Sequence, residues 1–272
     1  MCSTCGCGQP DDVVKITIPG EKNNVDDVQN HEHDLNHDHT NSHHHDHHSH
    51  DTREVKLEQD ILYKNNLLAE RNRGFFLAKN IVSLNLVSSP GSGKTTLLEK
   101  TIQLLDSKIS LSIIEGDQQT SNDADRIAKT GANVVQVNTG KGCHLDAHMV
   151  LHAIQKLQPD QDSVLFIENV GNLVCPALFD LGEKWRVVIM SVTEGEDKPI
   201  KYPDMFMTSQ ICIINKIDLL PYVEFDLKKA KDYARKVNPE IIFMEMSATK
   251  GDGMDVWIDW IKQQMQRKDI LV

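Results

Sequence analysis

The sequence predicts an α/β fold with three layers, in which helices cover both faces of a mostly parallel sheet of about seven strands. Short apolar runs alternate along the chain with longer amphipathic segments, which is the pattern of strands joined by crossover helices. With 272 residues, 39% of them hydrophobic, the chain has enough apolar side chains for one substantial core or two small ones. The runs expected to form strands are residues 83–87, 111–115, 134–137, 164–167, 187–192, 211–214 and 241–246.

The N-terminal segment, residues 1–51, differs in composition from the rest of the chain. It holds ten of the thirteen histidines, the cysteines Cys2, Cys5 and Cys7, and ten acidic residues against two lysines. Its histidine-rich part has almost no apolar side chains, so we expect this tail to be largely disordered. Thiolates and imidazoles favour zinc, nickel, copper or cobalt, and we predict that the tail binds such metals. A solvated linker is the alternative, whereas an expression tag is disfavoured because the histidines are internal and interrupted.

The chain after the tail divides into a helical segment and a globular domain. Residues 52–80 are expected to be helical and to pack on the outside of a domain formed by residues 81–272. The helical prediction rests on an apolar stripe with approximate helical spacing, formed by Leu57, Ile61, Leu68 and Phe75. The net charge of the chain is −11, and most of it belongs to the tail, so the globular part is nearly neutral.

Charge and hydropathy exclude several classes of function. No basic patch indicates a nucleic-acid partner, and no apolar run approaches the length needed to span a membrane. The N-terminus lacks the charged-then-apolar layout of a secretory signal, so a cytoplasmic location is expected. Thiols stay reduced there, and the six cysteines are therefore expected to bind metal or to be buried, as we expect for Cys212 inside a strand.

A phosphate-binding loop follows the first predicted strand. The run from Ser88 to Thr95, SSPGSGKT, lies between that strand and a predicted helix, which is the setting that a P-loop requires. Its glycines allow backbone N–H groups to face phosphate oxygens, Lys94 is expected to neutralise the phosphates, and the Thr95 hydroxyl to bind Mg²⁺. A chance glycine-rich turn is the alternative. The residues expected to hold the nucleotide here are Gly91, Ser92, Gly93, Lys94, Thr95 and Thr96.

Carboxylates follow two further predicted strands. Glu168 comes at the end of the strand 164–167 and is expected to hold Mg²⁺ or its water, while the Gly171 amide could contact the γ-phosphate and sense hydrolysis. We count Lys94, Thr95, Glu168 and Gly171 as the catalytic residues. Asp117 is a second candidate on the metal side, and capping of the next helix is an equally good interpretation of it.

Two later motifs indicate that the base is guanine. Asn215, Lys216 and Asp218 form the Asn-Lys-x-Asp pattern of GTPases after the strand 211–214, and Ser247-Ala248 follows the last strand. The carboxylate of Asp218 can accept hydrogen bonds from the ring N1–H and the exocyclic amine of guanine together, a pair of donors that adenine lacks. Because both motifs follow strands in the required order, GTP is the predicted nucleotide.

A second metal site is predicted inside the domain. Cys143 and His144 lie in the loop after the strand 134–137, and Cys175 lies in the loop after Glu168. Both loops are expected at the phosphate edge of the sheet, so a metal there would be coupled to the nucleotide state. A closed thiolate-rich site normally has four ligands, and a symmetric dimer would complete it. The alternative is that the cysteines are small packing residues. His148 and His152 continue at helical spacing and are expected to be surface or packing residues.

The motifs resemble those of the hydrogenase maturation factors of the HypB family, the nickel-incorporation GTPases. The resemblance covers nearly the whole chain and includes Ser88, which belongs to the loop of that family. It rests on the Cys2/Cys5/Cys7 start, the histidine tract, residues 85–96, Cys143-His144, residues 168–176 and residues 215–218. It implies GTP as substrate, Ni²⁺ as cargo, a nucleotide- and metal-dependent homodimer, and transfer of nickel to the accessory protein HypA and a hydrogenase large subunit.

The sequence therefore predicts a metallochaperone GTPase that uses GTP/GDP and Mg²⁺ and carries Ni²⁺, with Ni²⁺ or Zn²⁺ at Cys143, His144 and Cys175. No obvious general base is present, so slow intrinsic hydrolysis is expected. One alternative is a passive metal-storage protein whose GTPase domain is regulatory. Another is a urease-type GTPase, which is disfavoured because Ala177, rather than the histidine of that family, follows Cys175-Pro176.

Overall fold

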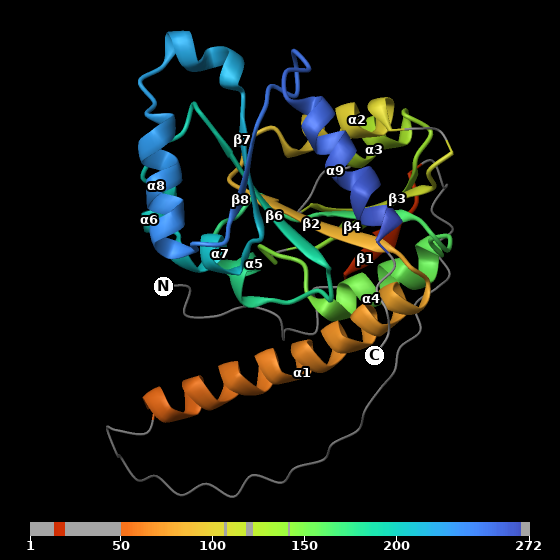
Figure 1. Cartoon of the computed structure of the whole chain (residues 1–272). Coiled ribbons are helices and arrows are strands. Elements are labelled where there is room, and N and C mark those ends of the chain that lie inside the picture. The colour runs from red at the N-terminus through yellow and green to blue at the C-terminus, as the bar shows by residue number, and fades with distance from the viewer. Residues whose placement is uncertain (1–13, 20–49, 106–107, 118–121, 141, 268–272) are drawn as a thin grey trace, which may run out of the picture.

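The computed structural model describes residues 14–19, 50–105, 108–117, 122–140 and 142–267, and within them it contains one eight-stranded sheet (Figure 1). The order across the sheet is β1-β4-β3-β5-β2-β6-β7-β8, and every pairing is parallel except that of β1 with β4. The strands are β1 (Lys15–Thr17), β2 (Val82–Ser88), β3 (Leu111–Asp117), β4 (Asn133–Asn138), β5 (Val164–Glu168), β6 (Trp185–Ser191), β7 (Ile211–Asn215) and β8 (Ile242–Glu245). The predicted α/β class is confirmed, and each of the seven predicted strands is present.

Helices cover both faces of the sheet. They are α1 (His50–Ala78), α2 (Lys94–Leu104), α3 (Asn122–Ala128), α4 (Ala147–Leu157), α5 (Cys175–Leu178), α6 (Lys198–Lys201), α7 (Pro203–Thr208), α8 (Leu227–Val237) and α9 (Met254–Gln266), with a 3₁₀ helix η1 (Ile217–Tyr222). Successive strand residues point to opposite faces, so Ile113 packs with α2, α3 and α9 whereas Ile114 packs with α4. The central strands are buried on both sides and accordingly consist of near-continuous apolar runs.

Strand β1 was not predicted. Its three residues lie in the segment that the sequence assigned to a largely disordered tail, and they pair antiparallel with β4 at the sheet edge. Ile16 and Ile18 pack against the core on the α4 side, and Lys156 Nζ donates to the Ile16 carbonyl at 3.2 Å. An alternating run of apolar and polar residues in an acidic segment thus finds a place on an existing sheet edge. Cys2, Cys5, Cys7 and the histidines up to His48 lie outside the described residues.

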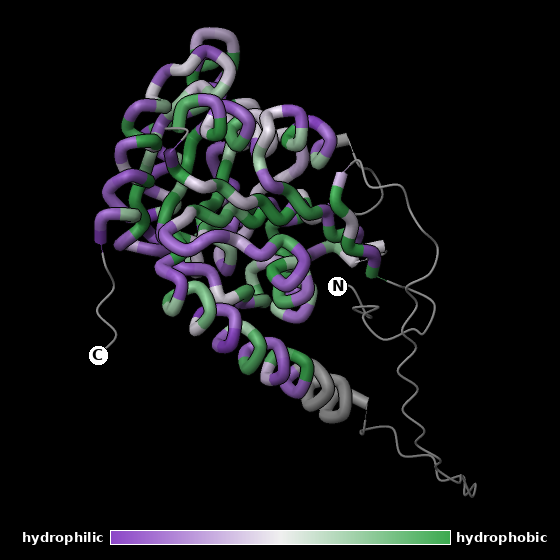
Figure 2. Tube along the Cα trace, turned by 90° about the vertical axis from the view of Figure 1, so that its right-hand side faces the viewer, coloured by the Kyte–Doolittle hydropathy of each residue, from purple (hydrophilic) through white to green (hydrophobic). Residues whose placement is uncertain are grey.

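Helix α1 is continuous over 29 residues, whereas the sequence predicted only a broken stripe. Two buried asparagines dock it: Asn65 Nδ2 donates to the Asp180 carbonyl at 2.8 Å, and Asn72 Nδ2 donates to Ala147 at 2.9 Å and to Leu181 at 3.1 Å. The C-terminal half of α1 lies along α4 (Figure 1), and Figure 2 shows hydrophilic and hydrophobic residues interspersed along the long helix α1. Buried polar side chains therefore help to hold α1 against the domain. Because asparagines occupy positions on the buried face, the apolar stripe in the sequence looks broken although the helix is continuous. None of the described helices combines the length and apolarity needed to cross a membrane.

The strand order positions the functional residues. The chain passes from β2 to β3, β4 and β5 on one side and to β6, β7 and β8 on the other. The carboxyl end of β2 therefore lies at the point where the winding direction changes, which is where ligands bind in open α/β sheets.

Candidate functional site

The loop between β2 and α2 forms one wall of a cavity of about 520 Å³. Gly91 and Gly93 have φ angles of +78° and +96°, a backbone conformation that side chains with a Cβ rarely adopt. Lys94 begins α2, and its Nζ donates to Ser88 Oγ at 3.0 Å. The cavity therefore lies at a helix N-terminus whose unpaired N–H groups suit an anion. The lining includes every predicted P-loop residue, namely Gly91, Ser92, Gly93, Lys94, Thr95 and Thr96, together with Asp117, Glu168, Gly171 and Lys216.

A pair of buried carboxylates forms the floor of this cavity. Glu168 Oε1 accepts from Thr95 Oγ1 at 2.7 Å, and Glu115 lies directly opposite Glu168 in the β3–β5 register. Burial raises the pKa of Glu168, which Lys94 opposes, and burial together with the Glu168 charge raises the pKa of Glu115 well above its ordinary value. Glu115 Oε2 and Glu168 Oε2 are buried without a hydrogen-bond partner among the described residues.

Glu115 was not among the predicted site residues. A charged residue inside an otherwise apolar strand was the available signal, but its significance depends on the strand that pairs with it. Asp117, at the tip of β3, lines the cavity, and residues 118–121, which join it to α3, lie outside the described residues, so both interpretations of Asp117 remain predictions. Asp123 and Arg126 of α3 also line the cavity and were missed.

Asn215 connects the P-loop to the segment after β8. Its Nδ2 donates to the Ser92 carbonyl at 2.9 Å, while its Oδ1 accepts from Ala248 N at 3.1 Å and from Lys216 N at 2.8 Å. Lys216 has a φ of 63°, and its Nζ donates to the Gly91 carbonyl at 2.7 Å, so its stem crosses the loop. The structure thus brings the predicted base-recognition residues Asn215, Lys216 and Ala248 to the P-loop.

Asp218 and Ser247 lie beyond the residues that line the cavity. Asp218 is half-buried in η1, and Ser247 is buried, with its Oγ accepting from Lys250 N at 3.1 Å. Since the cavity is bounded by the P-loop and the carboxylates, it corresponds to the phosphate end of the site. Asp218 lies two residues beyond Lys216 in the same loop, and its contact with the base remains a prediction.

The structure brings Cys143, His144 and Cys175 together. One ligand atom from each lies within 4.8 Å of the others, and Cys143 Sγ is 3.8 Å from His144 Nδ1. Burial lowers the pKa of His144, which Asp146 opposes, so the imidazole favours the neutral form that binds metals. The His144 ring lies on Phe179 with centroids 4.0 Å apart. Two thiols and an imidazole in this arrangement are a ligand set for zinc, nickel or a similar ion.

The loop after β5 joins the cavity to this cluster. A Cβ on Gly171 would lie 3.2 Å from the Pro90 ring, so the loop packs against the P-loop at that point. One residue further, Asn172 Nδ2 donates to the Cys143 carbonyl at 3.3 Å. The same loop ends at Cys175, where α5 begins. A single short segment therefore contacts the nucleotide cavity and carries one member of the metal cluster.

The remaining cysteines and histidines of the described residues lie elsewhere. Cys212 is fully buried in β7, as expected, and burial raises the pKa of its thiol to about 12. His148 and His152 are exposed on α4 with their Nε2 atoms 3.0 Å apart, and they are not part of the cluster of three.

The fold and the cavity define a P-loop nucleotide-binding protein. A family model described as "CobW/HypB/UreG, nucleotide-binding domain" matches residues 82–245. The hydrogenase maturation factor HypB of Escherichia coli K12 is 48% identical over 97% of this chain and 99% of that protein. The chain belongs to the HypB hydrogenase maturation factors of the CobW/HypB/UreG family.

Two solved structures agree with this assignment. HypB from Archaeoglobus fulgidus has a TM-score of 0.69 at 39% identity and covers 75% of this chain and 99% of its own. HypB from Helicobacter pylori, solved in complex with nickel, has a TM-score of 0.70 at 36% identity and covers 75% of this chain and 95% of its own.

Proposed function

We propose that this protein is a GTP-hydrolysing nickel chaperone of the cytoplasm that delivers Ni²⁺ for the maturation of a [NiFe]-hydrogenase. One observation carries the proposal: the segment from Glu168 to Cys175 contacts both the nucleotide cavity and the Cys143/His144/Cys175 cluster. Membership of the HypB family and the nickel in the Helicobacter pylori relative support Ni²⁺ as the cargo.

The chain fits Mg²⁺ as a companion of the nucleotide. Glu115 Oε2 and Glu168 Oε2 lie buried beside the cavity without a partner in the described part of the chain, and the Thr95 hydroxyl is adjacent. Carboxylate and hydroxyl oxygens are ligands that Mg²⁺ prefers. Thr95, Glu168 and Asp117 would hold the ion or its waters, and it would supply charge neutralisation at the phosphates.

The protein groups in the cavity perform the remaining tasks. Lys94 leaves Ser88 Oγ to neutralise the phosphate oxygens, and the N-terminus of α2 orients them. The Gly171 amide follows the γ-phosphate in this proposal, and the close packing of Gly171 on Pro90 supports that role. The backbone of the loop after β5 positions the attacking water. Slow hydrolysis is expected, because none of the predicted site residues acts as a general base.

Guanine is selected by the second loop system. The Asn215 side chain hydrogen-bonds both the Ser92 carbonyl of the P-loop and Ala248 N, so it fixes the position of the proposed base-binding loop relative to the phosphate-binding loop. Asp218 accepts from the two guanine donors, Lys216 lays its stem on the base, and the Ser247-Ala248 backbone addresses the carbonyl.

Coupling follows from the shared segment. When the γ-phosphate leaves, Gly171 loses a partner, and movement of its loop changes the position of Cys175 relative to Cys143 and His144. The metal affinity then differs between GTP and GDP states, and linkage requires metal to alter nucleotide affinity by the same factor. A homodimer that shares the cluster would supply the missing ligand, so dimerisation follows the same cycle.

The test uses the full chain with Cys2, Cys5 and Cys7 replaced by Ala, which removes the tail thiolates. Nickel affinity and sedimentation are measured in GDP and in a non-hydrolysable GTP analogue. We expect affinities that differ by about 5–150-fold between the two states, the usual range of allosteric coupling. Cys175→Ala should abolish the site. Cys212→Ala is the matched control, because its thiol is buried in the core. Equal affinity in both nucleotide states would refute the coupling.

Delivery is separated from storage by a transfer assay. HypA and a hydrogenase large subunit, the proposed partners, are offered to the nickel-loaded protein, and transfer is compared for the unmodified chain and Lys94→Ala. If the protein is a chaperone, the variant retains nickel and fails to deliver it. If both deliver equally, the chain is a metal store whose nucleotide site is regulatory.

A further inference from the structure

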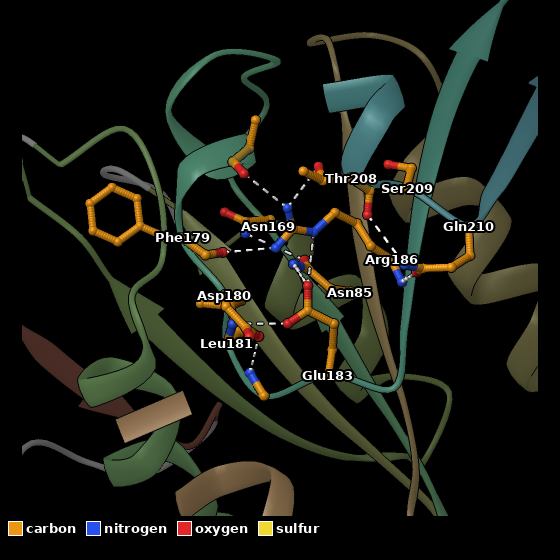
Figure 3. A network of polar contacts seen from close by, with 12 residues as sticks. Asn85, Asn169, Phe179, Asp180, Leu181, Glu183, Arg186, Thr208, Ser209 and Gln210 are labelled. Atoms are coloured by element: carbon orange, nitrogen blue, oxygen red, sulfur yellow. Dashed lines mark hydrogen bonds and ion pairs between the residues drawn. The ribbon is translucent and has the colours of Figure 1, made fainter. Parts of the chain in front are cut away.

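A row of buried polar side chains connects Asn169 through Asn85 and Glu183 to Arg186 (Figure 3). Asn85 is fully buried in the middle of β2, where its neighbours Leu84 and Leu86 face the opposite side of the sheet. Its Nδ2 donates to Glu183 Oε1 at 3.0 Å, and its Oδ1 accepts from Asn169 Nδ2 at 3.4 Å. Asn85 precedes the P-loop and has no role in the nucleotide site described above.

Glu183 joins Asn85 to Arg186. Its Oε1 also accepts from Arg186 Nε at 2.8 Å, and its Oε2 accepts from Leu181 N at 2.8 Å. Burial opposes ionisation of Glu183, but the Arg186 charge and the hydrogen bonds from Asn85 and Leu181 lower its pKa overall. The side chains of both members of the ion pair are at most 7% exposed.

Arg186 holds the segment that carries Cys175. Its guanidinium donates to the Ala177 carbonyl at 3.1 Å and to the Phe179 carbonyl at 2.9 Å, and a further bond reaches Thr208 Oγ1 at 3.0 Å. Phe179 in turn lies on the His144 ring. The planar guanidinium holds these acceptors in one fixed geometry, whereas a lysine would offer fewer donors on a more flexible side chain.

The other end of the row reaches the nucleotide side. Asn169 follows Glu168 directly, and its Oδ1 accepts from Val170 N at 2.9 Å and from Leu145 N at 3.2 Å. Leu145 follows His144. The bond between Asn169 and Asn85 is long, at 3.4 Å, and it connects the loop after Glu168 to Glu183 and Arg186.

A buried ion pair is weak evidence for stability, because apolar residues of similar volume usually serve as well. The Glu183–Arg186 pair matters here because Arg186 bonds the segment that carries Cys175. Groups that hydrogen-bond the ligand-bearing segment from behind orient metal ligands and tune their affinity.

We propose that Asn169, Asn85, Glu183 and Arg186 form a buried polar relay that sets the position of Cys175 according to the state of the loop after Glu168. The four are positioning residues for the metal site, and the inference rests on the proposed coupling of nickel to the nucleotide. When the loop carrying Asn169 moves, Asn85 and Glu183 adjust, and Arg186 shifts the Ala177 and Phe179 carbonyls.

The experiment uses the full chain with Cys2, Cys5 and Cys7 replaced by Ala as the reference protein. Thiolate-to-nickel charge-transfer absorption then reports Cys143 and Cys175, because the only other cysteine, Cys212, is buried in the core. Nickel is titrated in GDP and in a non-hydrolysable GTP analogue, and the ratio of the two affinities is the readout. A merely structural role would lower both affinities without changing the ratio.

Asn85→Leu removes the hydrogen bonds of Asn85 to Asn169 and Glu183 while keeping a side chain of similar volume. Asn85→Ser is the second variant in case the leucine prevents folding. The control is Asn238→Leu, which also removes hydrogen bonds to backbone carbonyls, those of Phe206 at 3.1 Å and Ser209 at 2.8 Å, but Asn238 is bonded to none of the four relay residues. In the Asn85 variants we expect the nickel affinities measured with GDP and with the GTP analogue to differ by no more than about threefold. In the control, the difference seen in the reference protein should persist. Arg186→Lys should weaken nickel binding by about tenfold or more, and the ratio of the two affinities should also fall, because Arg186 connects the relay to the segment that carries Cys175.

The possible failures are distinguishable. A reference protein with equal affinities in both states overturns the proposed function and this inference together. A reference protein with a clear ratio that folded Asn85 variants retain overturns the relay alone. Collapse of the ratio in Asn238→Leu also overturns it, because the effect would then be general to asparagines that hold backbone carbonyls.

Discussion

Gly93→Ala tests whether the contact between the P-loop and Asn215 contributes to stability and to nucleotide binding. Gly93 has a φ of +96°, and a Cβ there would lie 2.5 Å from Asn215 Nδ2. The left-handed conformation costs an alanine about 1–2 kcal/mol. The contact also displaces the Asn215 amide from Ser92 O and Ala248 N, and each lost hydrogen bond costs about 1 kcal/mol. We expect the free energy of unfolding to fall by about 3–4 kcal/mol in total, combining these two costs.

Two other glycines separate strain from contact. Gly131 has a φ of +84°, and Gly91 has a φ of +78°, and neither would bring a Cβ within 4 Å of another group. Urea denaturation should therefore show a loss of about 1–2 kcal/mol for Gly131→Ala, which lies outside the cavity. Fluorescent GDP binding should be at least about tenfold weaker for Gly93→Ala than for Gly91→Ala, because only the former disturbs Asn215. If Gly93→Ala and Gly131→Ala lose the same stability, the contact with Asn215 has no energetic consequence and the reasoning is wrong.

Three further predictions concern the base, the buried acid and the tail. Asp218→Asn should weaken GTP binding by about tenfold or more and favour xanthosine triphosphate, since a charged acceptor contributes about 1.5–3 kcal/mol; an unchanged preference in competition assays excludes Asp218 from base recognition. The pKa of Glu183 lies below its ordinary 4.5, so its stabilisation is present above that pH and is lost on acidification through the folded-state pKa. Glu183→Gln should therefore be less stable at neutral pH and depend less on pH in urea denaturation, and parallel pH profiles would contradict this. Substitution of Cys2, Cys5 and Cys7 by Ala should remove a tight nickel component from competition titrations and leave the weak histidine binding; persistence of the tight component places that site elsewhere.

Local patterns predicted much of the fold because strands and P-loops are encoded by neighbouring residues. The predicted strand 211–214 corresponds to β7, and the predicted strand 241–246 to β8. The P-loop lies between β2 and α2 as expected, since its glycines are needed where φ is positive. The predicted meeting of Cys143, His144 and Cys175 at one edge is likewise observed, and their metal binding remains a prediction.

The features that the sequence did not predict, β1 and the role of Glu115, both depend on residues that are distant along the chain. β1 is three residues long and lies in an acidic segment, so composition hid it, and only the open edge of β4 makes it a strand. Glu115 gave no local signal beyond a charge in an apolar run. Its proximity to Glu168 arises from the β3–β5 register, which no window of sequence encodes.

The sequence by itself determined which chemical groups stand at the strand ends, because spacing along the chain fixes which residues follow each strand. Tertiary structure decided which of these groups meet. β5 lies between β3 and β2 in the sheet, so Glu168 lies beside Glu115 and Asn169 reaches Asn85. The physical reason is that strand order and register are set by the packing of the whole core, whereas a motif reports only its own backbone and nearest neighbours.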